Sequence, residues 1–148
     1  METAAVLREE AFGFSKDIFA KNLALLDTKH FAPTLQELAL DQLLESPPGS
    51  MTLGNERHLV LRVSDANGQY QLNSRYNPDA EAKAILSESS IDDDTNVIVI
   101  FGFGNAGILR SLIAGEDIQK VKIVVIEPSL DLFAWTMGHE DFSDVLSH

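Results

Sequence analysis

A glycine-rich segment followed by a distant carboxylate is the part of the chain whose residue types point to ligand binding. Gly102, Gly104 and Gly107 have the spacing Gly-x-Gly-x-x-Gly, and Glu127 follows about 20 residues later. In proteins that bind dinucleotides or methyl donors, the first such glycine permits a sharp turn, the second lets the backbone approach the ligand, and the third lets the helix pack closely on the sheet. The later acid binds ribose hydroxyls. With Asn105, these residues are the predicted ligand-binding set, and the predicted ligand is a nucleotide or nucleotide-sugar.

The same residues also have a purely structural interpretation. Glycines are needed wherever a strand turns sharply into a helix, and Glu127 before Pro128 can simply end a strand. Single matches to this glycine pattern are common by chance, so both interpretations stay open. The chain offers no plausible set of general acid, general base and nucleophile, and we therefore expect no catalytic residues in it.

Other residues with chemical potential are weaker candidates. The four histidines, His30, His58, His139 and His148, do not have the spacing of metal ligands, so we expect no metal site. Asp92, Asp93 and Asp94 are consecutive rather than alternating, which favours a solvated turn over a calcium loop.

Arg75 and Tyr76 allow two interpretations. They are adjacent and stand just before Asn77-Pro78. An arginine beside a tyrosine can hold a phosphate or an acidic substrate, and it can also form a structural cation-π or hydrogen-bonded contact. The structural role is the one we favour.

The elements that must position the glycines follow a strand-helix-strand order. Residues 97–101 form an unbroken β-branched and aromatic run, which is typical of a strand covered on both faces at the centre of a sheet. A helical segment at 106–114 separates this run from a second one at 121–126. This order predicts a right-handed parallel crossover. A helix over 129–138 should follow, with Ser129 as its cap, Asp131 in its first turn and Gly138 near its end.

The first half of the chain predicts helices and then a hairpin. Apolar residues recur at helical spacing between 4 and 44, with a second helix start at Thr34, which Glu37 can complete as a capping box. Residues 46–50 contain two prolines and a glycine and predict a linker. The helical faces are formed by Ile18, Phe19, Leu23, Leu25, Leu26, Leu35, Leu38, Leu40, Leu43 and Leu44.

A hairpin and another helix should come next. Residues 59–63 and 69–72 flank Asn67-Gly68, which supplies positive φ for a tight β connection. Asn77-Pro78 predicts a cap and a first helical position for a helix that ends near residue 86. The hairpin is a candidate to extend the parallel sheet, and the N-terminal helices are candidates to cover it.

Composition narrows the class of protein. The chain has 148 residues, 45% apolar and 23% charged, which fits one folded α/β domain. Its formal net charge of −12 disfavours nucleic acid and anionic lipid as partners. The absence of cysteine excludes disulfides and thiolate chemistry and agrees with a cytoplasmic protein. No secretory signal or membrane-length apolar stretch is evident, because the longest strongly apolar run covers only 97–103.

Several motifs, in order along the chain, resemble the motility-associated factor (Maf) family. They are the segments 74–78, with Glu81-Ala82, then 97–104, 126–128, 131–133 and finally 141–146. The resemblance extends over about residues 22–146 and lies in the order of the motifs rather than in any one of them. One departure is the Asn105-Ala106-Gly107 sequence, which completes the dinucleotide-like turn where the family has bulkier residues.

The resemblance carries expectations about function. Members of the family are glycosyltransferase-like bacterial proteins implicated in adding nonulosonic acid sugars to serines and threonines of flagellin. This chain is similar to their N-terminal domain, whereas transferase chemistry is assigned to a following domain related to the pterin diphosphokinase-like group. The resemblance therefore implies a non-catalytic interaction or positioning module. Its expected partners are the following catalytic domain, flagellin or a second copy of the chain.

The predicted organisation is one compact α/β domain that forms the N-terminal part of a longer protein. Residues 1–46 are the N-terminal helical segment. Residues 51–148 contain a β-hairpin and a small Rossmann-like half with parallel strands. The alternative from a different class is a small Rossmann-like enzyme domain that binds a nucleotide or S-adenosylmethionine.

Overall fold

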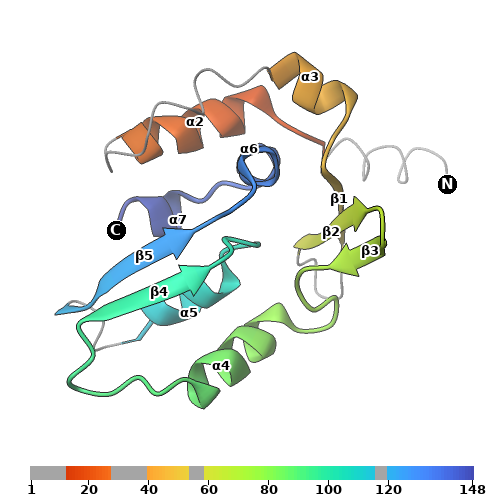
Figure 1. Ribbon diagram of the computed structural model, residues 1–148. Helices are drawn as coiled ribbons and strands as arrows, with labels where there is room; N and C mark the ends of the chain where they lie inside the picture. The colour runs from red at the N-terminus through yellow and green to blue at the C-terminus, as the bar shows by residue number, and fades with distance from the viewer. Residues whose placement is uncertain (1–12, 28–39, 54–58, 116–119) are drawn as a thin grey trace, which may run out of the picture.

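The computed structural model describes residues 13–27, 40–53, 59–115 and 120–148. Its helices are α2 (Lys16–Asp27), α3 (Leu40–Glu45), α4 (Pro78–Glu88), α5 (Gly107–Ile113), α6 (Leu130–Met137) and α7 (Ser143–Leu146). Its strands are β1 (Gly49–Leu53), β2 (Leu59–Asp65), β3 (Gly68–Gln71), β4 (Val97–Phe101) and β5 (Lys122–Ile126). The fold is mixed α/β, as the sequence predicts (Figure 1).

The predicted parallel crossover is confirmed. Strands β4 and β5 pair in parallel, with Val97 opposite Lys122 and Phe101 opposite Ile126, and α5 connects them. Because paired residues of parallel strands project to the same side, Ile100 and Val125 share one face, and Phe101 and Ile126 share the other. Ile100 is buried, and Val125 packs against the hydrophobic core, so the core lies against that first face.

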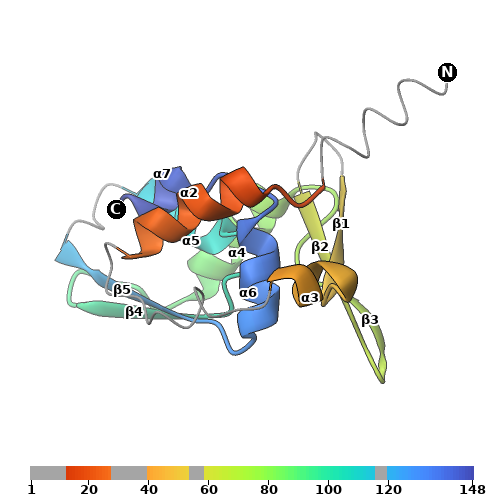
Figure 2. The same cartoon turned by 90° about the horizontal axis from the view of Figure 1, so that it is seen from above.

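The prediction that β4 is covered on both faces at the centre of a sheet is wrong. In the described residues β4 pairs only with β5, and helices α2, α4, α5 and α7 all lie on one side of these strands (Figure 2). On the other side Phe101 is 74% exposed, Val99 is 58% exposed, and Val97 and Ile126 are also exposed. An unbroken apolar run shows that a strand needs cover on both faces, but it does not show which element supplies that cover. Lys122, opposite Val97, is also exposed on this side, at the end of the strands away from Phe101. We call the apolar residues of this side, Val97, Val99, Phe101 and Ile126, the bare face of the sheet.

The predicted hairpin forms but does not extend this sheet. Strands β2 and β3 pair antiparallel, and Gly68 has a φ of +144°, as the tight turn requires. They join β1 in a separate three-stranded sheet of order β1-β2-β3. Strand β1 begins at Gly49, so part of the segment predicted as a linker is a strand. A Cβ at Gly49 would lie 2.3 Å from the carbonyl oxygen of Arg62, which explains why a glycine, normally a strand breaker, stands in this strand.

Two predicted helix caps are confirmed in detail. The side chain of Asn77 accepts a hydrogen bond from the amide of Ala80, and Pro78 is the first residue of α4. Likewise, the hydroxyl of Ser129 accepts from the amide of Leu132 at the start of α6, and Gly138 is the C-cap of that helix. These caps fix where the helices begin and so fix the turns before them.

Two helices of the predicted N-terminal helical segment, α2 and α3, lie within the described residues. Phe19, Leu26 and Leu43 are buried in the same core as Phe103 and Phe133, so both parts of the chain share one core. The predicted helix start at Thr34 and Glu37, the apolar residues Leu35 and Leu38, and the histidines at 30 and 58 lie outside the described residues. No helix of the described residues is both long and apolar enough to cross a bilayer.

One buried amide connects α2 to the C-terminal helices. Asn22 is fully buried, and its Nδ2 donates to the carbonyl oxygens of Met137 at 2.8 Å and Glu140 at 2.7 Å. Its Oδ1 accepts from the amide of Phe142 at 3.0 Å. All three partners are backbone groups that would otherwise lack a hydrogen bond inside the protein.

We expect Asn22→Ala to lower the free energy of unfolding by about 2–4 kcal/mol, because three backbone groups lose their partner in the core. Urea denaturation followed by circular dichroism measures the change. Asn96→Ala is the matched control, since Asn96 is exposed and its side chain donates one hydrogen bond, to the carbonyl oxygen of Asp94. Equal losses of unfolding free energy for the two substitutions would show that the buried amide of Asn22 stabilises the fold no more than an exposed one.

Candidate functional site

The glycine-rich turn between β4 and α5 has the backbone conformations that its first two glycines allow. Gly102 has a φ of +91° and Gly104 a φ of +55°, both in the region that favours glycine. The predicted role of Gly102 in a sharp turn is therefore confirmed. A third positive φ, +62°, falls on Ala106, the N-cap of α5, where a Cβ makes this conformation costly.

Gly107 has a different role from the predicted one. We expected it to let the helix pack closely on the sheet. A Cβ at Gly107 would instead lie 3.0 Å from Oδ1 of Asn105 and 3.8 Å from the Cβ of Ala82 in α4. The absence of a side chain therefore makes room for the carboxamide of Asn105, whereas a Cβ would be in ordinary contact with Ala82.

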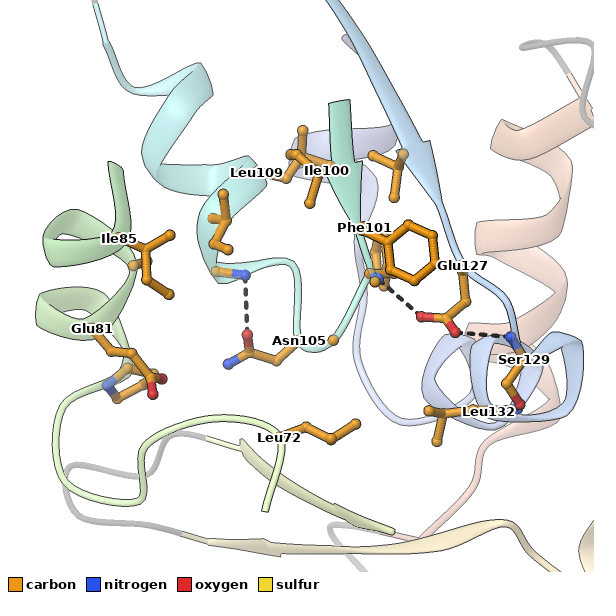
Figure 3. A pocket seen from close by; sticks show the side chains of 18 of the residues that line it. Leu72, Glu81, Ile85, Ile100, Phe101, Asn105, Leu109, Glu127, Ser129 and Leu132 are labelled. Atoms are coloured by element: carbon orange, nitrogen blue, oxygen red, sulfur yellow. Dashed lines mark hydrogen bonds between the residues drawn. The ribbon is translucent and has the colours of Figure 1, made fainter. Parts of the chain in front are cut away.

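Glu127 bonds to the protein through both of its carboxylate oxygens. Oε2 accepts from the amide of Phe103 at 2.9 Å, and Oε1 accepts from the amide of Ser129 at 3.0 Å (Figure 3). The first bond reaches back to the turn after β4, and the second reaches the start of α6. Glu127 therefore joins the two turns at the carboxyl ends of β4 and β5.

Four of the six backbone amides in the turn are used within the protein. The amide of Phe103 bonds to Glu127, as described above. The amide of Gly102 donates to the carbonyl oxygen of Ile126 at 2.7 Å, and the amide of Ala106 donates to the carbonyl oxygen of Phe103 at 3.0 Å. The amide of Gly107 donates to Oδ1 of Asn105 at 3.0 Å. In a phosphate-binding turn, such amides point at the ligand instead.

These residues border a cleft of about 400 Å³ at the carboxyl ends of the two strands. That size falls within the usual range for small-molecule sites, and this edge of a parallel sheet is their usual place. The cleft contains all five residues predicted from the sequence, Gly102, Gly104, Asn105, Gly107 and Glu127. Leu72, Glu81, Ile85, Ser129 and Leu132 also line the cleft. Figure 3 shows Glu81 and Ile85 on one side of it and Ser129 and Leu132 on the other.

The charge on the cleft is negative. Its lining includes the carboxylates of Glu81 and Glu127 and no lysine, arginine or histidine among the described residues. Arg110 on α5 does not line the cleft, but its Nη1 donates to the carbonyl oxygen of Asn105 at 3.3 Å. Its guanidinium bonds to Asp144 at 2.8 Å and to Glu140 at 3.0 Å.

The Arg110 cluster shows pKa shifts with clear causes. Burial acts to lower the pKa of Arg110, but its bonds to Asp144 and Glu140 outweigh this and raise it. The hydrogen bond from Arg110 lowers the pKa of Asp144. Burial raises the pKa of Glu140, although Arg110 opposes the shift. The arginine holds α5 to α7, so these shifts reflect packing rather than a reactive group.

The wall formed by α4 was not predicted to belong to the site. Glu81 accepts a 2.7 Å hydrogen bond from the amide of Ser74, and the hydroxyl of Ser74 accepts from the amides of Tyr76 and Asn77. These bonds explain the local order of the segment 74–81 in terms of turn and cap formation. Nothing in the residue spacing shows that this helix faces the glycine-rich turn, because that contact is tertiary.

The weaker candidates take structural roles. The guanidinium of Arg75 lies 5.4 Å from the ring centroid of Tyr76, which agrees with the favoured cation-π interpretation. Asp92 accepts hydrogen bonds from the amide of Asp94 and the hydroxyl of Thr95 in an exposed turn. Among the described residues no group of histidines and acids is placed to hold a metal ion.

Comparison of the chain with models of protein families, with curated proteins and with solved structures finds no match. The fold and the cleft are therefore interpreted from their own geometry.

We expect Glu127→Ala to lower the free energy of unfolding by about 1.5–3 kcal/mol, because two amides lose a charged acceptor. Glu127→Gln keeps one acceptor oxygen, so its free energy of unfolding should fall between those of the wild type and Glu127→Ala. The amide of Phe103 should also exchange with solvent faster in both variants, which NMR measures directly. Glu88→Ala, at an exposed position on α4, is the control and should be nearly neutral. Unchanged exchange at Phe103 would contradict the link between the two turns.

A second prediction concerns pH. Hydrogen bonds from Lys21 and Ser143 lower the pKa of Asp141 from its ordinary 3.8 to about 2. A carboxyl with a depressed pKa in the folded state stabilises it above its unfolded pKa, and this stability disappears as pH falls through the folded value. The melting temperature should therefore drop between about pH 5 and pH 2. Lys21→Met should make the drop smaller, whereas Lys83→Met, at an exposed lysine of α4, should not. Identical profiles for both variants would contradict this assignment.

Proposed function

We propose that this chain is a non-catalytic interaction module of a cytoplasmic glycosyltransferase of the Maf type, in which another domain transfers nonulosonic acid sugars to flagellin. The bare face of the sheet is the observation that carries this proposal. Parallel strands are normally covered on both faces, and here an apolar face of four exposed side chains has no cover among the described residues. The order of motifs that resembles the Maf family supports the transferase's catalytic domain as the partner that covers the bare face.

The chemistry of the described residues supports a role in positioning rather than catalysis. The carboxylate of Glu127 and the carboxamide oxygen of Asn105 accept hydrogen bonds from backbone amides, which gives both side chains a structural role. None of the pKa shifts falls on a residue that lines the cleft. A catalytic acid or base usually shows such a shift together with access to a substrate.

The bare face is proposed to pack against the catalytic domain. An apolar surface without charge at its centre is typical of the core of a lasting interface. Helices α2, α4 and α7 lie on the opposite side of the sheet (Figure 2), and the charge of Lys122 lies at the end of the strands away from Phe101. Flagellin and a second copy of the chain are the other partners to be tested.

The experiment is a binding titration with a separately produced catalytic domain of a Maf-type transferase. We expect the double variant Val99→Asp with Phe101→Asp to weaken binding at least about tenfold, because two charges would be buried at the interface. Tyr70→Asp is the control, since Tyr70 is exposed on β3 of the other sheet and should not affect binding.

Three outcomes would contradict the proposal. One is the absence of binding to the catalytic domain. Another is equal binding by the wild type and the double variant. The third is transfer of an activated nonulosonic acid to flagellin by this chain alone. Binding of flagellin or self-association that the double variant abolishes would reassign the same face to that partner.

A further inference from the structure

The cleft at the carboxyl ends of β4 and β5 lies on a different part of the molecule from the centre of the bare face. Its volume of about 400 Å³ and its position suit a small molecule. What it can bind depends on which hydrogen-bonding groups and charges its lining presents.

Most of the amides that could hold an external anion in the glycine-rich turn are already bonded within the protein. A phosphate in such a turn is held by the backbone amides. Here the carboxylate of Glu127 occupies the amide of Phe103, and the carboxamide oxygen of Asn105 occupies that of Gly107. The amides of Gly102 and Ala106 bond to backbone carbonyls. The protein's own oxygens therefore occupy four of the six amides that a phosphate could use.

The charge of the lining also disfavours a phosphate group. Glu81 and Glu127 contribute two carboxylates to the lining, and no basic side chain among the described residues opposes them. The guanidinium of Arg110 contacts the turn only at the carbonyl oxygen of Asn105, and its charge is already paired with Asp144 and Glu140. A phosphate group in this cleft would meet repulsion without any compensating cation.

The remaining polar groups suit hydroxyls and ring nitrogens. Each oxygen of Glu127 accepts one bond and has a further lone pair available. The Nδ2 of Asn105 donates no hydrogen bond to the described residues, and Figure 3 shows it on the side of Asn105 that faces α4. Leu72, Ile85 and Leu132 provide apolar walls. A flat heterocyclic base joined to a sugar with two adjacent hydroxyls matches this combination.

We propose that the cleft binds the unphosphorylated nucleoside part of a ligand, with Glu127 accepting from the ribose hydroxyls and Asn105 donating to the base. Among the ligands that the glycine pattern allows, this proposal favours those without a phosphate group. Free nucleosides and S-adenosylmethionine share this chemistry, whereas nucleoside phosphates and nucleotide-sugars carry the charge that the cleft disfavours.

The test is a series of calorimetric titrations of the full chain with adenosine, cytidine and S-adenosylmethionine, each nucleoside paired with its 5′-monophosphate. We expect at least one unphosphorylated compound to bind with a Kd below about 1 mM, and the matching monophosphate to bind at least about tenfold more weakly. Amide chemical shifts of residues 102–107 and 127–129 should change on binding. S-Adenosylmethionine binding more tightly than adenosine would assign the ligand to the methyl-donor class.

Two variants keep the proposal falsifiable without unfolding the protein. Asn105→Asp retains the acceptor oxygen for the amide of Gly107 but removes the free donor, so nucleoside binding should weaken at least about fivefold. Ile85→Lys places a cation at an exposed position of the cleft wall and should raise affinity for the monophosphate. Ile91→Lys is its control, because Ile91 is exposed and does not line the cleft.

The results that would overturn the proposal are specific. They are the absence of saturable binding of all three unphosphorylated compounds, a monophosphate that binds the wild type as tightly as its nucleoside, or shifts confined to residues outside the cleft. Failure of the interaction with a transferase domain leaves this result unaffected, since the two experiments use different ligands and different variants.

Discussion

The cleft depends on the two hydrogen bonds of the Glu127 carboxylate. They join the turn that leaves β4 to the turn that leaves β5, and each donor is a backbone amide. A two-stranded sheet has only one pair of strands to hold its ends in register, so its turns need a link beyond the strand ladder. Bonds from amides to a charged acceptor are among the stronger hydrogen bonds of proteins, which suits Glu127 to this role.

The same link changes the meaning of the glycine pattern. Gly102 and Gly104 adopt the positive φ that a nucleotide-type turn requires, yet amides that would hold a phosphate are bonded to Glu127 and Asn105. The backbone shape of the turn and its ligand preference are therefore separate properties. The glycines determine the shape, and the acceptors that fill the turn determine which ligands remain compatible with it.

Much of the local structure could be predicted because it is encoded by neighbouring residues. The caps at Asn77 and Ser129, the hairpin turn before Gly68 and the strand-helix-strand order around Gly102 all depend on residues within a few positions of one another. The one-sided cover of β4 could not be predicted, since an apolar strand has the same sequence whether its second face is covered or bare. The wall of the cleft at Glu81 and Ile85 was missed for the same reason, because only tertiary packing brings α4 to the turn.

The bare face and the cleft meet at one residue. Phe101 is the most exposed large apolar side chain of the described residues, and it also lines the cleft. Figure 3 shows its ring beside Glu127. A partner that covers the bare face would therefore bury a side chain that forms part of the cleft wall. By linkage, any change that the partner makes in the affinity of the cleft must be matched by an equal effect of the ligand on the partner's affinity. The position of Phe101 thus provides a direct physical route by which occupation of the cleft and association through the sheet influence each other.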